Sequence, residues 1–292
     1  MSLDHNRPLR FPVSGGQGYS WHVTLSTRRR SYWFLFVLSV LILGAAVVMS
    51  LPYLSKGAHS DPAVLSWSAF GISFESRQLA ALGAILLSAF STSLLFAILV
   101  SFRKTASEEI FFLAFWALSC SFESGRILVA RLYDAGAPPS WMSFVTHVVL
   151  AARFGGYGAF FFAGLRSAGF RNERPGRAVM AAIGVGIAAA SALPLDSGTF
   201  EPTNLIRSAY PVERLLLVAA LALITAANLL VAVETTGERV FRTVAVGAVA
   251  LLVGQALLVS GWHPEILVAG VALLVVGARL YVSRLHSHYL WQ

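Results

Sequence analysis

The chain has 292 residues, of which 57% are hydrophobic and only 12% are charged, and its formal net charge is +8. A soluble domain of this size carries about a quarter charged residues, so the composition excludes an ordinary soluble globular protein. The basic residues are scattered along the chain, which favours the lipid bilayer as the partner and disfavours nucleic acid.

The first 30 residues are polar, end in three consecutive arginines, and are predicted to form a short cytoplasmic tail. The apolar run 32–54 is longer than the hydrophobic region of a secretory signal and lacks a small-x-small cleavage site. We therefore expect it to be an uncleaved first membrane helix. A single transmembrane domain is predicted over residues 31–285, followed by a short C-terminal tail over residues 286–292.

Eight apolar runs are long enough, or nearly so, to cross about 30 Å of hydrocarbon at about 1.5 Å per residue. They are the segments 32–54, 78–102, 109–131, 141–165, 178–195, 212–233, 241–259 and 265–283. The predicted fold is an all-α polytopic integral membrane protein with about eight transmembrane helices. The fifth and seventh runs are the shortest, and seven helices are the alternative.

The basic residues predict the orientation of these helices. With the N-terminus in the cytoplasm, fifteen Lys and Arg residues fall in the inner segments and five in the outer segments. This bias follows the positive-inside rule and predicts that both termini are cytoplasmic. The excess of Arg over Lys, with abundant Ala, Gly and Val, indicates a GC-rich bacterial genome, so the inner (plasma) membrane is the expected location.

Two of the predicted outer segments are long enough to have structure of their own. In 55–77, Asp61 and Pro62 could start a helix, whereas residues 65–74 alternate as a strand does, and both readings stay open. The segment 196–211 contains Gly198 and two prolines and is predicted to be irregular.

Four ionisable residues fall well inside the predicted third and fourth helices: Glu123, Arg126, His147 and Arg153. Such groups are costly in a bilayer and are functional candidates. The two helices are consecutive and antiparallel, so we expect them to be neighbours and Glu123 to pair with Arg126 or Arg153. The group is predicted either to lock two helices together or to bind an anionic head group through arginine.

Other polar residues give weaker signals. Gln255 is a further candidate, expected near the level of Arg126, while serines and threonines in helices usually bond to their own backbone. His147 has no second buried histidine for haem, and the lone Cys120 has no metal-binding spacing around it. No catalytic motif, metal site or cofactor is predicted.

Small residues recur at helical spacing in the fourth and fifth predicted helices. Gly155, Gly156 and Gly186 take part in these repeats and are predicted to lie where helices pack closely.

Three classes of function remain open. The first is a non-enzymatic membrane module, meaning a sensor, a scaffold or a subunit that binds partner subunits or further copies of itself. The second is a small transporter or a lipid- or anion-binding protein that uses the Glu/Arg group. The third is a membrane-embedded enzyme with Glu123 or His147 as acid or base.

Overall fold

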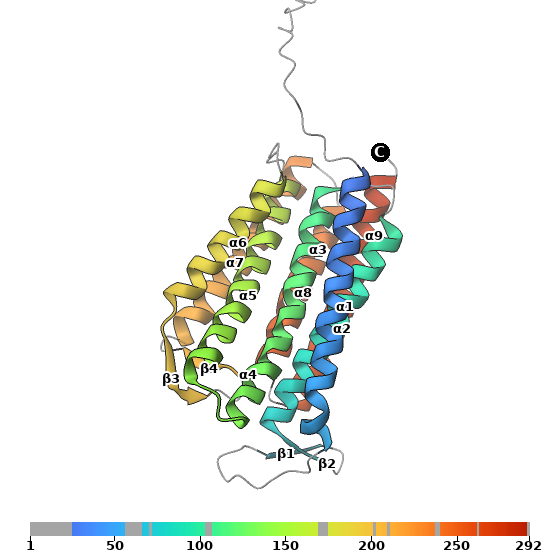
Figure 1. Cartoon of the computed structure of the whole chain (residues 1–292). Helices are drawn as coiled ribbons and strands as arrows, with labels where there is room; N and C mark the ends of the chain where they lie inside the picture. The colour runs from blue at the N-terminus through green and yellow to red at the C-terminus, as the bar shows by residue number, and fades with distance from the viewer. Residues whose placement is uncertain are drawn as a thin grey trace, which may run out of the picture.

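The computed structural model describes residues 25–55, 66–69, 72–102, 107–168, 175–200, 203–208, 211–236, 240–261 and 263–290. Long helices dominate these residues and lie roughly side by side in a bundle (Figure 1). The helices are α1 (Leu25–Ser55), α2 (Ser76–Ser101), α3 (Glu108–Ser121), α4 (Gly125–Asp134), α5 (Pro139–Ser167), α6 (Pro175–Ala192), α7 (Pro211–Thr236), α8 (Val240–Ser260) and α9 (Pro264–Leu290). A 3-10 turn, η1 (Phe122–Ser124), joins α3 to α4, and these three elements form one rod.

The helices confirm that the chain is a membrane protein. Among the described residues, six helical rods are long and apolar enough to cross a membrane, and the α3–α4 rod is one of them. The apolar segments described in α6 and α7 are shorter, Gly176–Ala192 and Ala219–Val231. The predicted number of eight membrane helices is therefore not confirmed.

Sequence signals explain where several helices begin. Helices α5, α6, α7 and α9 each start with a proline, whose missing N–H group costs nothing in the first turn. Helix α3 begins after Ser107, whose hydroxyl accepts a hydrogen bond from the N–H of Ile110 at 3.3 Å. Glu108 and Glu109 follow in its first turn, at the positive end of the helix dipole.

Two antiparallel hairpins lie at the end of the bundle opposite the start of α1 and the end of α9 (Figure 1). They are β1 (Ser66–Ala69) with β2 (Ile72–Glu75), and β3 (Leu195–Phe200) with β4 (Ile206–Ser208). For residues 66–69 and 72–75 the strand interpretation is correct, and the predicted helix start at Asp61 lies outside the described residues. Within its described residues, the expectation of an irregular segment at 196–211 is wrong, because Leu195–Phe200 and Ile206–Ser208 pair as strands.

The ends of the bundle also differ from the predicted boundaries. Helix α1 begins at Leu25, inside the predicted tail of residues 1–30, and residues 1–24 lie outside the described part of the chain. Helix α9 continues to Leu290, through most of the predicted tail of residues 286–292. Arginine is a good helix former, so a helix can extend beyond the apolar run that crosses the bilayer.

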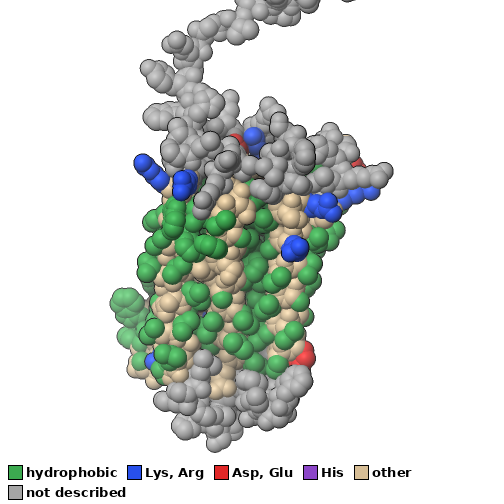
Figure 2. Space-filling view, turned by 90° about the vertical axis from the view of Figure 1, so that its right-hand side faces the viewer, with side chains coloured by type: hydrophobic (Ala, Val, Ile, Leu, Met, Phe, Trp, Pro, Cys, Tyr) green, Lys and Arg blue, Asp and Glu red, His purple; other side chains and the backbone are tan. Residues whose placement is uncertain are grey.

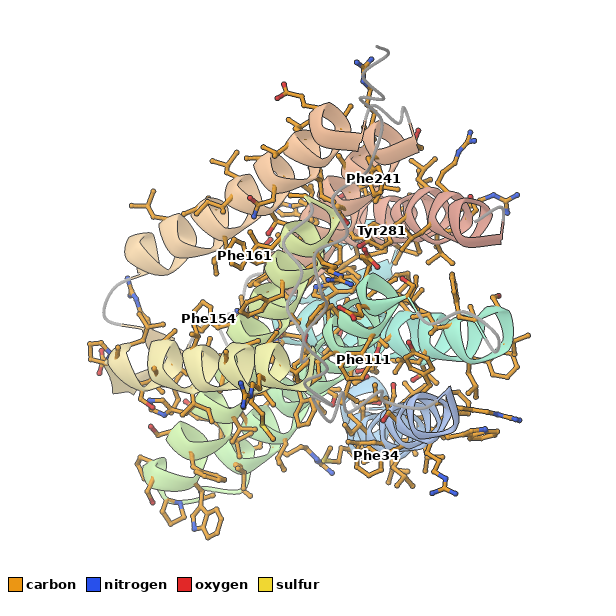
Figure 3. The ribbon with its side chains drawn as sticks, turned by 90° about the horizontal axis from the view of Figure 1, so that it is seen from above. Phe34, Phe111, Phe154, Phe161, Phe241 and Tyr281 are labelled. Carbon is orange, nitrogen blue, oxygen red and sulfur yellow. The ribbon has the colours of Figure 1, made fainter. Side chains whose placement is uncertain are left out.

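The surface and the interior of the bundle are both apolar. The face drawn in Figure 2 carries hydrophobic side chains over most of its length, with Lys and Arg side chains gathered near one end. Viewed from above, Phe154 and Tyr281 lie inside the bundle, whereas Phe34 of α1 is at its periphery and exposed (Figure 3). This distribution suits a protein whose outer surface meets acyl chains.

An aromatic series crosses the interior and connects α2, α3, α5 and α9. Its ring centroids lie 6.4 Å apart for Phe90 and Trp116, 5.2 Å for Trp116 and Phe160, and 5.6 Å for Phe160 and Tyr281. Tilted and edge-on contacts at these distances are favourable for aromatic rings.

Candidate functional site

Glu123, in the 3-10 turn η1, forms a double hydrogen bond with Arg153 of α5. The Nε of Arg153 donates to Oε1 of Glu123 at 2.6 Å, and Nη2 donates to Oε2 at 2.7 Å. The two side chains are only 1% and 6% exposed. A bidentate contact of this kind is the strongest arrangement of an arginine and a carboxylate. It joins the α3–α4 rod to α5 in the middle of the bundle.

The local geometry around Glu123 brings the two rods close together. The hydroxyl of Ser124 donates to the carbonyl of Ser121 at 2.8 Å, within the segment where the α-helix tightens into η1. Gly125 follows, and a Cβ atom there would come within 2.6 Å of the Val149 side chain on α5. The absence of a side chain at Gly125 therefore allows the start of α4 to contact α5.

Arg126 is the second arginine near Glu123, and it is fully buried. Its Nε donates to the backbone carbonyl of Thr203 at 2.7 Å, in the turn between β3 and β4. The sequence left Arg126 and Arg153 as alternative partners of Glu123, and the structure places the bidentate bonds on Arg153. Arg126 instead holds the β3–β4 turn against α4.

Asn204 and Leu205, in the turn between β3 and β4, are buried. Asn204 adopts a left-handed conformation with φ of 61°, and its side-chain amide donates to the carbonyl of Arg77 at 3.0 Å. Leu205 and Ile206 pack in an apolar cluster with residues of α4 and α5. An asparagine tolerates this backbone conformation better than most residues, so Asn204 allows the turn that directs Leu205 and Ile206 inward.

His147 does not join the charged group. Its Nδ1 lies 2.9 Å from the carbonyl of Ser143, one turn earlier in α5, and its side chain is half-buried. The described contacts of His147 are thus local to its own helix. This agrees with the helical rotation of about 240° that separates it from Arg153.

Gln255 of α8 is fully buried and accepts a hydrogen bond from Nε1 of Trp116 at 2.9 Å. Trp116 precedes Arg126 by ten residues in the same rod, which corresponds to about 15 Å along its axis. The expectation that Gln255 lies at the level of Arg126 is therefore wrong. Helix lengths alone give no register between α3 and α8, which are far apart in the sequence.

A cluster of hydroxyl groups joins α1, α2 and α3, although serines and threonines in helices were expected to bond to their own backbone. Ser39 Oγ lies 2.7 Å from both Thr92 Oγ1 and Ser121 Oγ, and Ser91 Oγ lies 2.7 Å from Ser121 Oγ. Ser88 also bonds across helices, donating to the carbonyl of Ser121 at 3.1 Å. Thr92 and Ser93 bond to their own helix as expected.

The three glycines selected from the sequence all lie at helix contacts. A Cβ atom on Gly156 would come within 2.8 Å of the Ser119 Cβ on α3. A Cβ atom on Gly186 of α6 would come within 2.6 Å of the backbone nitrogen of Gly155 on α5. At Gly155 itself the nearest atom, the Ala182 carbonyl oxygen, is 3.5 Å away. Gly156 and Gly186 are thus the tighter positions.

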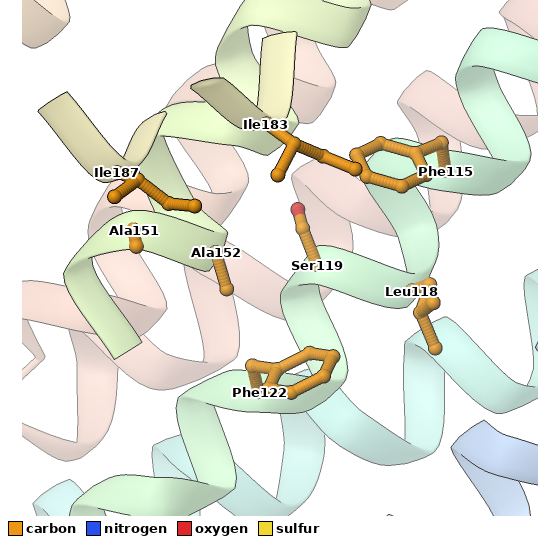
Figure 4. A pocket seen from close by; sticks show the side chains of 8 residues that line it. All are labelled: Phe115, Leu118, Ser119, Phe122, Ala151, Ala152, Ile183 and Ile187. Carbon is orange, nitrogen blue, oxygen red and sulfur yellow. The ribbon is translucent and has the colours of Figure 1, made fainter. Parts of the chain in front are cut away.

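Two apolar cavities lie on either side of Phe122. The α6-side cavity has a volume of about 260 Å³ and is lined by residues of α3, α5 and α6, with the Ser119 hydroxyl as the polar group that Figure 4 shows. The α1-side cavity has a volume of about 330 Å³ and is lined by residues of α1, η1, α4 and α5. A third apolar groove, of about 460 Å³, lies between α2 and α9.

Comparisons with family models, curated proteins and solved structures find no match to this chain. The site must therefore be interpreted from its own chemistry. Within the described part of the chain, no three His, Cys, Asp or Glu residues come together as a metal site. The polar groups that do come together connect helices: Glu123 to Arg153, Arg126 to the β3–β4 turn, and Trp116 to Gln255.

Proposed function

We propose that the chain is a non-enzymatic multi-pass membrane module, acting as a sensor, a scaffold or a subunit of a larger membrane assembly. One observation carries the proposal: both carboxylate oxygens of Glu123 are occupied by Arg153 in a buried bidentate contact. A carboxylate used as a general base or as a carrier of ions has to release its partner during turnover. The geometry of Glu123 supports a fixed connection between helices instead.

The proposal includes the orientation in the membrane. The start of α1 and the end of α9 lie at the same end of the bundle, which favours an even number of crossings over seven (Figure 1). Together with the basic residues of the inner segments, this supports eight crossings with both termini in the cytoplasm of a bacterial inner membrane.

The orientation is tested with a reporter fused after Gln292. A reporter that is active in the cytoplasm is the expected result, because the last inner segment carries Arg279 and Arg284. Activity only on the opposite side of the membrane contradicts the orientation and the even number of crossings.

The module function is tested in the native membrane at natural abundance. After chemical cross-linking and solubilisation in mild detergent, we expect the chain in a complex of defined stoichiometry with a second membrane protein or a second copy. A chain found only as a monomer contradicts the proposal. A Glu123→Gln variant serves as the comparison, because loosening α5 from the α3–α4 rod should reduce the amount of complex.

A further inference from the structure

The two cavities beside Phe122 follow one continuous line between two helical rods. On the α3–α4 rod, the lining positions recur every three or four residues from Phe115 to Leu128. On α5 they recur in the same way from Phe144 to Ala152. Residues at this spacing lie on one face of a helix. The two cavities are therefore parts of a single crevice, named here the Phe122 crevice, which the Phe122 side chain divides.

The ion pair lies next to the Phe122 crevice in the sequence of both rods. Phe122 and Ala152 line the crevice, while the residues that follow them in the sequence, Glu123 and Arg153, bond to each other and are buried. Helix α6 flanks one cavity through Ile183 and Ile187, and α1 flanks the other. Four elements thus surround the crevice, whereas the groove between α2 and α9 has only two walls.

We propose that the Phe122 crevice binds an acyl chain of a membrane lipid. This inference does not depend on the module function. The crevice lies in the membrane-spanning rods, and its lining is apolar except for Ser119 and Ser124. Within the bilayer, the molecules that reach the crevice are lipid acyl chains.

The length and the lining of the crevice match an extended hydrocarbon chain. From Phe115 to Leu128 it follows the rod for about 20 Å, or about two-thirds of the hydrocarbon thickness. Apart from the Ser119 and Ser124 side chains, its lining offers a ligand only apolar contacts. An acyl chain needs no hydrogen bonds and can make dispersion contacts with such a lining along its whole length.

Photolabelling tests the acyl-chain site. The full chain is reconstituted in phosphatidylcholine vesicles that contain a small fraction of phosphatidylcholine with a diazirine in its acyl chain. After illumination, the labelled residues are mapped by mass spectrometry. We expect labelling per residue at the crevice positions to exceed that on the exposed face of α1 about threefold, because a held chain makes more lasting contacts than a passing one.

Two matched pairs of variants separate the crevice from the general lipid surface. Ile187→Trp and Ala45→Trp place a large ring at the α6-side and α1-side cavities, and each should lower crevice labelling about threefold. Val185 and Val48 are exposed residues of the same two helices, and neither lines a cavity. Val185→Trp and Val48→Trp should therefore leave the crevice labelling unchanged. Labelling that is uniform over the lipid-facing surface overturns the proposal. The proposal is also overturned if Ile187→Trp has the same effect as Val185→Trp and Ala45→Trp has the same effect as Val48→Trp.

Discussion

Helices α1 to α5 are joined by polar side chains, whereas α8 and α9 are joined by backbone contact at glycines. In the first region, Glu123 bonds to Arg153 across two rods, and Ser121 contacts serines of α1 and α2. In the second region, a Cβ atom on Gly254 would come within 2.9 Å of the Gly270 carbonyl oxygen. Lipid tails are as apolar as the helix surfaces, so helices in a bilayer associate through close packing and hydrogen bonds. This chain combines both means in α1 to α5, where Gly156 also packs closely on α3, and uses glycine packing between α8 and α9.

The two regions should fail in opposite ways. A polar connection fails when one partner is removed, because the other is left buried without its bond. A glycine connection fails when a side chain is added, because the two backbones can no longer approach. Substitutions that remove groups therefore test the polar connections of α1 to α5, and substitutions that add groups test the glycine contacts.

The largest effect is expected at the ion pair. Glu123→Gln should lower the free energy of unfolding by about 3–5 kcal/mol, because it leaves Arg153 charged and buried without its counter-ion. Thermal unfolding of the purified protein in detergent measures the loss. Glu123→Gln with Arg153→Leu should recover part of it, because the stranded charge is gone.

The control for the ion pair uses the other arginine. Glu123→Gln with Arg126→Leu should recover nothing, since Arg126 bonds to the Thr203 carbonyl. Strictly additive losses in the double variant with Arg153→Leu would show that the two side chains do not stabilise each other.

The next effect is expected in the α8–α9 hairpin. Gly254→Leu should destabilise the protein by about 1–3 kcal/mol, because the added side chain forces the two backbones apart. Gly184→Leu is the matched control, since a Cβ atom on Gly184 meets nothing within 4 Å. Equal thermal stability of the two variants would show that α8 and α9 can separate without cost.

The glycines of α5 give a comparison within one helix. Gly156→Ala should cost about 1 kcal/mol or more, because its methyl group meets Ser119. Gly155→Ala should be close to neutral, because its nearest neighbour is 3.5 Å away. The folded yield in detergent and the melting temperature measure both. The reverse order of stabilities would contradict the packing of α5 against α3.

The smallest effect is expected in the hydroxyl cluster. Ser121→Ala should cost about 0.6 kcal/mol, the average found for interhelical hydrogen bonds in a membrane protein. Ser93→Ala should cost nothing measurable, since Ser93 is exposed and bonds only to its own helix at Ala89. If Ser121→Ala is as stable as Ser93→Ala, the hydroxyl cluster does not stabilise the packing of α1 on the bundle.

Particular residues show how far the sequence predicts the site. The cost of buried charge and the antiparallel order of neighbouring helices indicated that Glu123 would pair with Arg126 or Arg153, and the structure selects Arg153. The role of Arg126 was not predictable, because its partner is a backbone carbonyl of a segment that is distant in the sequence. Gln255 was placed at the wrong level for a related reason, since its partner Trp116 lies 139 positions away.

The glycines of α8 and α9 carry a sequence signal for close helix packing. Gly247, Gly254 and Gly261 are spaced by seven residues, as are Gly270 and Gly277. Two such series on consecutive helices predict a close antiparallel pair, and the structure places Gly247 against Gly277 and Gly254 against Gly270. The Ser39–Ser121 contact has no comparable signal, because it joins helices that are not consecutive.

The sequence by itself determined the class of the protein, the positions of its helical rods and the expectation that Glu123 pairs with Arg126 or Arg153. These follow from composition, from apolar runs whose length matches the bilayer, and from the high cost of charge in hydrocarbon. Only the tertiary structure decided that Arg126 holds the β3–β4 turn, that Gln255 accepts from Trp116, and that the cavities beside Phe122 form a line. These depend on the rotation and axial register of each helix against distant helices. Packing sets both quantities, and the periodicity of a single segment does not contain them.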